Sequence, residues 1–328
     1  MGAPQVVLVA SSPRTPPGCL TWPAWQALQA GPVLLQAGPH PQLAALRAAG
    51  VALEPVLPAP EPVLAGLLLE RARTQGRATW LAGVAGDPGL VRALGELTGG
   101  GSGADLQVVY GSHDLPGARL LDVVAVLDRL RSPGGCPWDA AQTHGSLMPY
   151  LLEEAYEAYE ALEEGDGPAL REELGDVLLQ VVLHARLATE TGGLGFDVDD
   201  VAGDLVDKLV RRHPHVFAGA PVDDLEGSWA ALKQAEKGRT SVTQGVPMGQ
   251  PALSLARKLQ SRGARLGAPV ASYAGMGGEL WALVERCRDA GVDPEAELRR
   301  VARRYRDRLA ELEQDLPATG QQWETLWS

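Results

Sequence analysis

The chain has 328 residues, of which 45% are hydrophobic, and its formal net charge is -12. This size and composition predict a soluble globular protein of about two or three domains. A chain this acidic is a poor candidate for binding nucleic acid through phosphate contacts, no apolar run of about 18 residues is present that could cross a membrane, and three scattered cysteines without a secretory signal favour a cytoplasmic protein that has no disulfides.

Residues 1–114 alternate short apolar runs with helical patterns. Strands are predicted at residues 5–10, 32–36, 51–58 and 78–84, and helices at residues 41–49 and 87–97. This alternation predicts a small α/β domain with parallel strands. The run TGGGSG at residues 98–103 is a flexible break within the domain.

From residue 115 onward the pattern is helical. Helices are predicted at residues 119–130, then from a cap at Thr143 or Ser146 to residue 164, and at residues 169–190, 197–212 and 225–237. The loop SPGGCPWD separates the first two helices, and Pro214 ends the helix at 197–212. Because the later connections are short, we expect four antiparallel helices that form a bundle within residues 115–240.

Residues 241–328 hold a further helical set. Helices are predicted at residues 251–263, 279–290 and 294–314, and the last two faintly echo residues 175–213, as an internal repeat would. The predicted fold class is therefore mainly α. A small α/β domain is followed by an all-α helical bundle and then by a helical C-terminal segment.

Lysine is rare in this chain. Only four of the 29 basic residues are lysines, and Lys208, Lys233 and Lys237 lie within 30 residues of one another. Because lysine offers a compact ammonium that suits phosphate oxygens, the cluster indicates a phosphate site. Chance clustering in an arginine-rich chain is the alternative.

Paired carboxylates on two consecutive helices are the most informative feature. Glu154 and Glu157 are spaced i,i+3 in the first helix and share one face. Glu173 and Asp176 have the same spacing in the second. Antiparallel helices would point both pairs into one gap, and Mg²⁺ prefers such oxygen ligands. The alternative for the first helix is a solvated acidic face, because its apolar residues lie opposite the glutamates.

The second helix favours the metal site. Residues 177–188 are apolar nearly all round, which predicts that this segment is buried. Glu173 and Asp176 stand at its start, and a buried carboxylate needs a cationic partner or a metal ion. Few basic residues lie near them in the sequence, so the two pairs together indicate a cation.

The motif EExxE at Glu153, Glu154 and Glu157, followed by ExxD at Glu173 and Asp176, resembles the signature of the MazG family of nucleoside triphosphate pyrophosphohydrolases. The likeness continues upstream in LLDVVAVLDRLRSPGGCPWDAAQTHGSLMPYLLEEAYE and downstream in DKLVRRHPHVF and SWAALKQAEK. It covers residues 115–240 and implies an all-α MazG-like catalytic domain.

The resemblance implies a magnesium centre, in which Mn²⁺ is a substitute ion. The implied ligands are Glu154, Glu157, Glu173 and Asp176. One carboxylate, Glu153 or Glu154, is expected to take the proton of the attacking water.

The resemblance also implies a phosphate site and a base site. Lys208 and Arg212, spaced i,i+4, would contact the phosphates together with Lys233. Trp229 precedes Lys233 by one helical turn and is a candidate for stacking on the base, with helix packing as its alternative. The base pocket is expected to be bordered by two further residues, Trp138 and Gln142.

Two other groups of residues could carry chemistry. His213 and His215 raise a zinc hypothesis, but no other Cys/His cluster supports it, so these histidines are expected at a helix terminus and turn. Cys136 has no histidine at a catalytic spacing and is expected to be a packing residue.

The flanking parts resemble domains that accompany this family. Residues 1–114 resemble a shortened tetrapyrrole methylase domain, notably in VVYGSHDLPG, but ASSPRTPPG replaces the glycine-rich turn, so methyl transfer is not expected. Residues 241–328 resemble a second MazG unit. Because Glu279 has no ExxD partner, this unit is expected to be degenerate.

The implied reaction converts an NTP or dNTP and water into the monophosphate and diphosphate, as nucleotide-pool house-cleaning requires. The alternatives are hydrolysis of another nucleotide pyrophosphate bond, a non-catalytic nucleotide- or partner-binding module, and a methylase with a helical tail. Because a helix hairpin seldom buries enough apolar area alone, we expect a homodimer.

Overall fold

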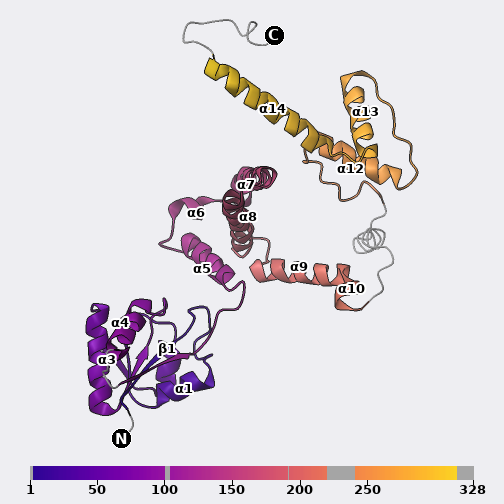
Figure 1. The fold of residues 1–328 in the computed structure, drawn as a ribbon. Coiled ribbons are helices and arrows are strands. Elements are labelled where there is room, and N and C mark those ends of the chain that lie inside the picture. Colours follow the sequence, from indigo (N-terminus) through magenta and orange to yellow (C-terminus); the bar gives the residue numbers. More distant parts are fainter. Residues whose placement is uncertain (1–2, 100–103, 191, 220–240, 316–328) are drawn as a thin grey trace. The chain divides into compact units, whose positions relative to one another are not determined.

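The computed structural model describes residues 3–99, 104–190, 192–219 and 241–315 (Figure 1). The chain divides into two compact units, Met1–Leu205 and Val206–Ser328. The first contains a sheet with its helices and the helices that carry the paired carboxylates. Among the described residues, no helix combines the length and the apolarity that a bilayer crossing needs.

A five-stranded sheet, parallel throughout, forms the N-terminal part of the first unit. Its strands are β1 (Gln5–Ala10), β2 (Val33–Gln36), β3 (Leu53–Val56), β4 (Arg77–Leu81) and β5 (Asp105–Tyr110), in the order β3-β2-β4-β1-β5. β1 pairs with both β4 and β5, which explains why Val6 to Val9 are buried. The predicted parallel α/β arrangement is confirmed. β5 was not predicted, because most of this edge strand is exposed and it lacks a clear apolar run.

Helices cover both faces of this sheet (Figure 1). α1 (Trp22–Gln29) and α2 (Leu43–Ala48) pack with Val7 and Val9 of β1, whereas α3 (Glu61–Gln75) and α4 (Pro88–Gly99) pack with Val6 and Leu8. Alternate residues of one strand therefore feed two cores. α1 and α3 were not predicted; the apolar residues of α3 are spread around the helix, so its 3.6-residue period is weak.

The first unit contains four further complete helices in its described part, and they are followed by the start of α9. They are α5 (Arg119–Arg131), α6 (Pro137–Ala141), α7 (His144–Glu164) and α8 (Gly167–Ala188). α7 packs along α8, and α5 packs against α8. Their shared core contains Leu127, Leu147, Val182, Leu183 and Leu187. α6 begins within the loop predicted at SPGGCPWD. A helix can start at Pro137 because a proline is well tolerated in the first turn.

The remaining helices are α9 (Val198–Arg212), which crosses the division at Leu205, and then α10 (Pro214–Phe217), α12 (Ala252–Ala264), α13 (Gly275–Asp289) and α14 (Pro294–Asp315). α12 packs against α13 and α14, as the three predicted C-terminal helices allow. α10 is a short helix in the segment where the sequence predicted only the end of the preceding helix. The helix predicted at residues 225–237 lies outside the described residues.

Candidate functional site

The candidate site is built on the α7–α8 hairpin. The Thr143 side chain accepts a hydrogen bond from the Ser146 N–H, and the Ser146 side chain accepts one from the Thr143 N–H, so both predicted cap residues take part in one capping box. α7 ends at Gly165, whose φ of 70° suits the left-handed turn. Asp166 then accepts from the Ala169 N–H and starts α8. This short turn folds α8 back along α7.

Carboxylates from both helices meet across the hairpin. Candidate ligand oxygens of Glu154, Glu157 and Glu173 all lie within 4.8 Å of one another. Asp176 is close enough to Glu154 for its charge to affect the pKa of that group. Glu157 is exposed, whereas Glu154, Glu173 and Asp176 are half-buried. The structure therefore brings together the four residues that the sequence assigns to a metal centre.

Burial and mutual repulsion favour the protonated form of this cluster. Burial is the largest cause that raises the pKa of Glu154, and the charge of Asp176 and a hydrogen bond with Glu157 raise it further. Burial also raises the pKa of Glu173, followed by the charges of Glu157 and Asp176. Among the residues that the structure describes, no cation is a cause of the shift in either group. A group of carboxylate oxygens that repel one another fits a hard divalent cation such as Mg²⁺.

The packing of α7 argues against a merely solvated acidic face. Leu152 and Leu162 expose 56% and 61% of their surface, whereas Glu154 is half-buried. The residues that α7 buries are Leu147, Ala158 and Ala161. An amphipathic surface helix would bury its leucines and expose its acids. α7 instead leaves these leucines exposed and brings Glu154 and Glu157 close to Glu173 of α8.

The other predicted phosphate and base residues stay predictions. Lys208 and Arg212 lie one turn apart on α9, both half-buried, in the second compact unit. Lys233 and Trp229 lie outside the described residues. Glu153, the alternative general base, is exposed on α7.

The predicted base-pocket residues Trp138 and Gln142 lie at α6. The Trp138 ring meets Tyr150 of α7 with ring centroids 6.2 Å apart and an interplanar angle of 75°. The Gln142 amide donates to the Trp138 carbonyl at 3.0 Å, and its side-chain oxygen accepts from the Ser146 hydroxyl at 2.7 Å. Sequence reasoning missed Tyr150, although it precedes Glu154 by four residues and therefore shares its helical face.

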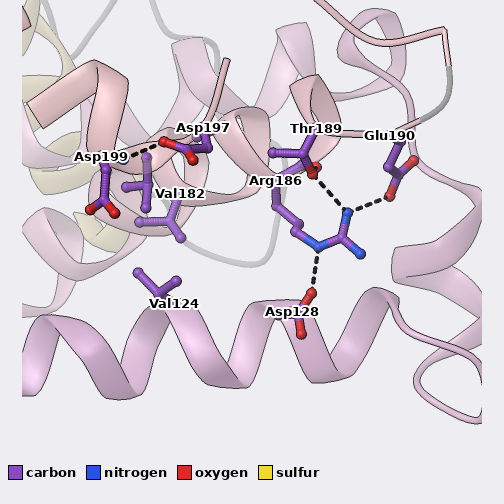
Figure 2. A pocket seen from close by; sticks show the side chains of 10 residues that line it. Val124, Asp128, Val182, Arg186, Thr189, Glu190, Asp197 and Asp199 are labelled. Carbon is purple, nitrogen blue, oxygen red and sulfur yellow. Dashed lines mark hydrogen bonds and ion pairs between the residues drawn. The ribbon is translucent and has the colours of Figure 1, made fainter. Parts of the chain in front are cut away.

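A cavity of 710 Å³ lies at the C-terminal end of α8 (Figure 2). Arg186 crosses its polar wall and donates to Asp128 at 2.7 Å and to Thr189 and Glu190 at 3.2 Å each. Arg186 follows Asp176 by almost three helical turns, about 15 Å. None of the four carboxylates lines this cavity, and Arg186 pairs with Asp128 and Glu190 in its wall.

The zinc hypothesis gains no support from the described part of the chain. Within those residues, the cluster of Glu154, Glu157 and Glu173 is the one group of three or more potential metal ligands. The His213 ring N–H donates to the Leu209 carbonyl at 2.7 Å, and its ring lies 5.6 Å from that of His215.

Comparison with known proteins points to the same region. The family model described as the MazG nucleotide pyrophosphohydrolase domain matches residues 142–217. That range contains α7, α8 and α9, and with them the four carboxylates, Lys208 and Arg212.

Relatives match more of the chain. An uncharacterized 26.1 kDa protein of Streptomyces cacaoi is 51% identical over 68% of this chain and 96% of its own length. The nucleoside triphosphate pyrophosphohydrolase/pyrophosphatase MazG of Thermotoga maritima is 36% identical over 61% of this chain and 87% of its own length. The nucleoside triphosphate pyrophosphohydrolase of Mycobacterium tuberculosis is 48% identical over 47% of each chain. The crystal structure of a mazG-related protein from Thermotoga maritima covers 35% of this chain and 97% of that chain, with 29% identity and a TM-score of 0.30.

Proposed function

The chain belongs to the MazG family of nucleoside triphosphate pyrophosphohydrolases, and from this membership we propose that it hydrolyses NTPs and dNTPs to the monophosphate and diphosphate. The observation that carries the proposal is the cluster of Glu154, Glu157, Glu173 and Asp176 across one hairpin. A non-catalytic module would have no need of four carboxylates that repel one another across one hairpin. House-cleaning of the nucleotide pool in the cytoplasm is the role that fits this reaction.

The four carboxylates would hold Mg²⁺, or Mn²⁺ in its place. When bound there, the ion would neutralise phosphate charge and lower the pKa of a water molecule. Glu153 or Glu154 would take the proton of that water. The cations Lys208, Arg212 and Lys233 would stabilise the diphosphate leaving group.

Removal of one carboxylate tests this assignment. We expect Asp176→Asn to abolish Mg²⁺-dependent diphosphate release from NTPs, because the donor set loses an anionic oxygen, while the helix content stays unchanged. Glu163→Gln is the matched control, because Glu163 follows Glu154 by nine residues and so lies about 180° away around α7. Diphosphate release is measured alongside circular dichroism. Turnover at the parent rate in Asp176→Asn would contradict the metal-site assignment.

Product analysis separates the related hydrolase. Diphosphate released from an NTP supports the proposed reaction. Turnover of a nucleotide diphosphate derivative, with no diphosphate released from any NTP, would support the alternative of another pyrophosphate bond.

The proposed domain division is 1–114, 115–240 and 241–328. β5 ends at Tyr110 and α5 begins at Arg119, in accord with the first boundary. The α/β part would then be the methylase-like remnant, with no methyl transfer.

The same arrangement of a glycine and an aspartate precedes both α9 and α14, and this repeat supports a degenerate second MazG-like unit. Gly195 and Gly291, with φ of 77° and 71°, each precede an aspartate by two residues. These aspartates, Asp197 and Asp293, accept two backbone N–H groups at the start of α9 and α14. α13–α14 would therefore correspond to α8–α9, without the paired carboxylates.

A homodimer would cover the apolar face of α7. Leu152 and Leu162 are joined on this helix by exposed Met148 and Leu151. An exposed apolar patch on an otherwise acidic chain marks an interaction surface. A second copy is the proposed occupant, because a two-fold axis would bury the same face of both chains.

A further inference from the structure

Two histidines meet at the open end of the α7–α8 hairpin. His144 is the first residue of α7, and His184 lies in the last two turns of α8. Their Nδ1 atoms are 2.8 Å apart, and the two rings stack in parallel with centroids 5.1 Å apart. A pair at this distance shares one proton, because Nδ1 of one ring must donate and Nδ1 of the other must accept. The bond joins the two helices at the end opposite to the turn at Gly165.

The surroundings of this pair disfavour added protons. Nε2 of both rings is buried and has no hydrogen-bond partner among the described residues, so an imidazolium would bury an unsatisfied N–H. His144 stands where the partial positive charge of the α7 N-terminus opposes a cation. Burial lowers the pKa of His184, and the charge of His144 lowers it further. The pair therefore holds together while one proton is shared, and a proton on each Nδ1 would break it.

Charged groups of the surrounding elements also lie at this end of the hairpin. They are Asp128 and Arg131 of α5, Asp139 of α6, Arg186 of α8, Glu190 just after it, and Asp197 and Asp199 at the start of α9. Arg131 pairs with Glu190. Arg186 pairs with Asp128 and Glu190. Among the described residues, the partner histidine is the one charge that shifts the pKa of His184, so no carboxylate of that part stabilises a second proton.

The carboxylate cluster lies between the histidine pair and the turn. Glu154 follows His144 by ten residues, about 15 Å along α7. On α8, Asp176, Gln180 and His184 are spaced by four residues and lie along one face. Gln180 is 3% exposed, so packing encloses the side chain that separates the aspartate from the histidine. A shift of α7 against α8 at the pair would therefore change the spacing of the carboxylates.

We propose that His144 and His184 form a proton-controlled clasp that holds α7 in register with α8, so that mild acid weakens the binding of Mg²⁺ at the carboxylate cluster. This inference rests on the proposed function, which puts the metal at the cluster. While the pair shares one hydrogen bond, the hairpin is joined at both ends, and its carboxylates are held at a fixed spacing. When each Nδ1 carries a proton, the two rings repel each other and this end of the hairpin opens.

Acid acts on the pair and on the carboxylates in opposite directions. Because the pKa of His184 is lowered, the stability that the pair contributes is fully present above the ordinary 6.5 and is lost as the pH falls through the lowered pKa. Because the pKa of Glu154 is raised, the metal-free cluster becomes less destabilising as the pH falls. A loss of stability in mild acid without metal therefore does not come from the cluster.

Unfolding of the metal-free protein tests the clasp. His184→Asn keeps a donor and an acceptor near the position of Nδ1 but takes up no proton. In EDTA, we expect the urea midpoint of the parent to fall more than that of His184→Asn between about pH 7.5 and about pH 5.5. His144→Asn makes the same change on α7 and should behave alike. His113→Asn, at an exposed histidine after β5, is the control and should follow the parent. An equal fall in the parent and both clasp variants would overturn the clasp.

Mg²⁺ binding tests the coupling between clasp and cluster. By calorimetry over the same pH range, we expect the Kd of Mg²⁺ to rise about fivefold more in the parent than in His184→Asn. Because coupling is reciprocal, Mg²⁺ should also shift the titration of the His184 ring to lower pH, as NMR can measure. His184→Phe removes the hydrogen bond at every pH and should raise the Kd at both ends of the range.

The outcomes distinguish the two proposals. A parent that binds no Mg²⁺ at neutral pH contradicts the proposed function, and unfolding in EDTA still tests the clasp. If the parent binds Mg²⁺, an equal rise of Kd in the parent and His184→Asn overturns the coupling, because the carboxylates alone would then set the pH dependence. A Kd that His184→Asn raises by the same factor at both pH values also overturns it, because the variant would then have altered the hairpin and not its response to protons.

Discussion

Glu154 illustrates how a metal-binding residue opposes the folding of the metal-free chain. Its pKa in the folded protein is raised above the ordinary 4.5, by burial first and then by its acidic neighbours. The folded state therefore holds a proton that the unfolded chain releases. The contribution of this group to stability is fully present below pH 4.5 and is lost as the pH rises through the raised folded pKa. At neutral pH the metal-free cluster is destabilising.

Neutralisation of Glu154 should therefore stabilise the metal-free protein. We expect Glu154→Gln to raise Tm in EDTA at pH 7 on the order of 1–3 °C, because one repelling charge is removed. Added Mg²⁺ should raise Tm of the parent and have no effect on the variant. Thermal unfolding in EDTA and in Mg²⁺ measures both effects, with Glu163→Gln as the control. A lower Tm for Glu154→Gln in EDTA would show that the cluster does not repel as described.

At the scale of elements, Arg131 ties three helices together. Its side chain is 3% exposed and donates to both oxygens of Glu190, after the end of α8, at 2.8 and 2.9 Å. It also donates to the carbonyls of Asp139 in α6 and Gln142 at its end. The guanidinium holds the pKa of Glu190 below its ordinary range. One residue of α5 thus fixes the segment that leads into α7.

Loss of this guanidinium should be costly. We expect Arg131→Met to lower the free energy of unfolding by about 3 kcal/mol, because Glu190 and two carbonyls lose a buried donor. The contribution of Glu190 is present above the ordinary pKa and is lost as the pH falls through the lowered one, so the parent should lose more stability on acidification than the variant. Urea unfolding at neutral and acid pH checks both. The Arg186 side chain is 25% exposed, so Arg186→Met should lower the free energy of unfolding by less. An equal loss would contradict the special role of Arg131.

The elements that could be predicted are those with strong local signals. β1 has a continuous apolar run, and α7 has a capping box at its start and a glycine at its end. The convergence of the carboxylates was also predictable, because the i,i+3 spacing and a short turn define it locally. α3 lacks a clear apolar stripe and β5 is a mostly exposed edge strand, so tertiary context decides them. The contact of Tyr150 with Trp138 could not be predicted, because Trp138 lies on α6, a short helix in a Pro/Gly-rich segment.

At the scale of the whole molecule, the exposed apolar face of α7 is the main unexplained surface of the carboxylate-bearing hairpin. Leu152 and Leu162 belong to it, and Leu174 of α8 is also exposed, at 53%. The proposed homodimer would bury this face and enlarge the small core of α5, α7 and α8. Such a core is otherwise limited to a few leucines and valines.

The dimer is checked by its mass. We expect light scattering at micromolar concentration to give twice the chain mass of 34.6 kDa. Leu152→Glu should give the single-chain mass with unchanged helix content, because a charge would be buried at the two-fold interface. Leu57→Glu, at an exposed leucine of the α/β part, serves as the control and should stay dimeric. A parent protein that gives the single-chain mass would contradict the proposed dimer.

All four carboxylates come from one hairpin that is closed by a short turn. Contacts between residues this close along the chain form early in folding, because little loop entropy is lost. The cluster would therefore be complete before β1 to β5 have found their pairing order, which joins residues far apart in the chain. In a full-length chain that refolds, a cation captured at that point would act as a folding ligand, and the hairpin would become the seed against which α5 docks.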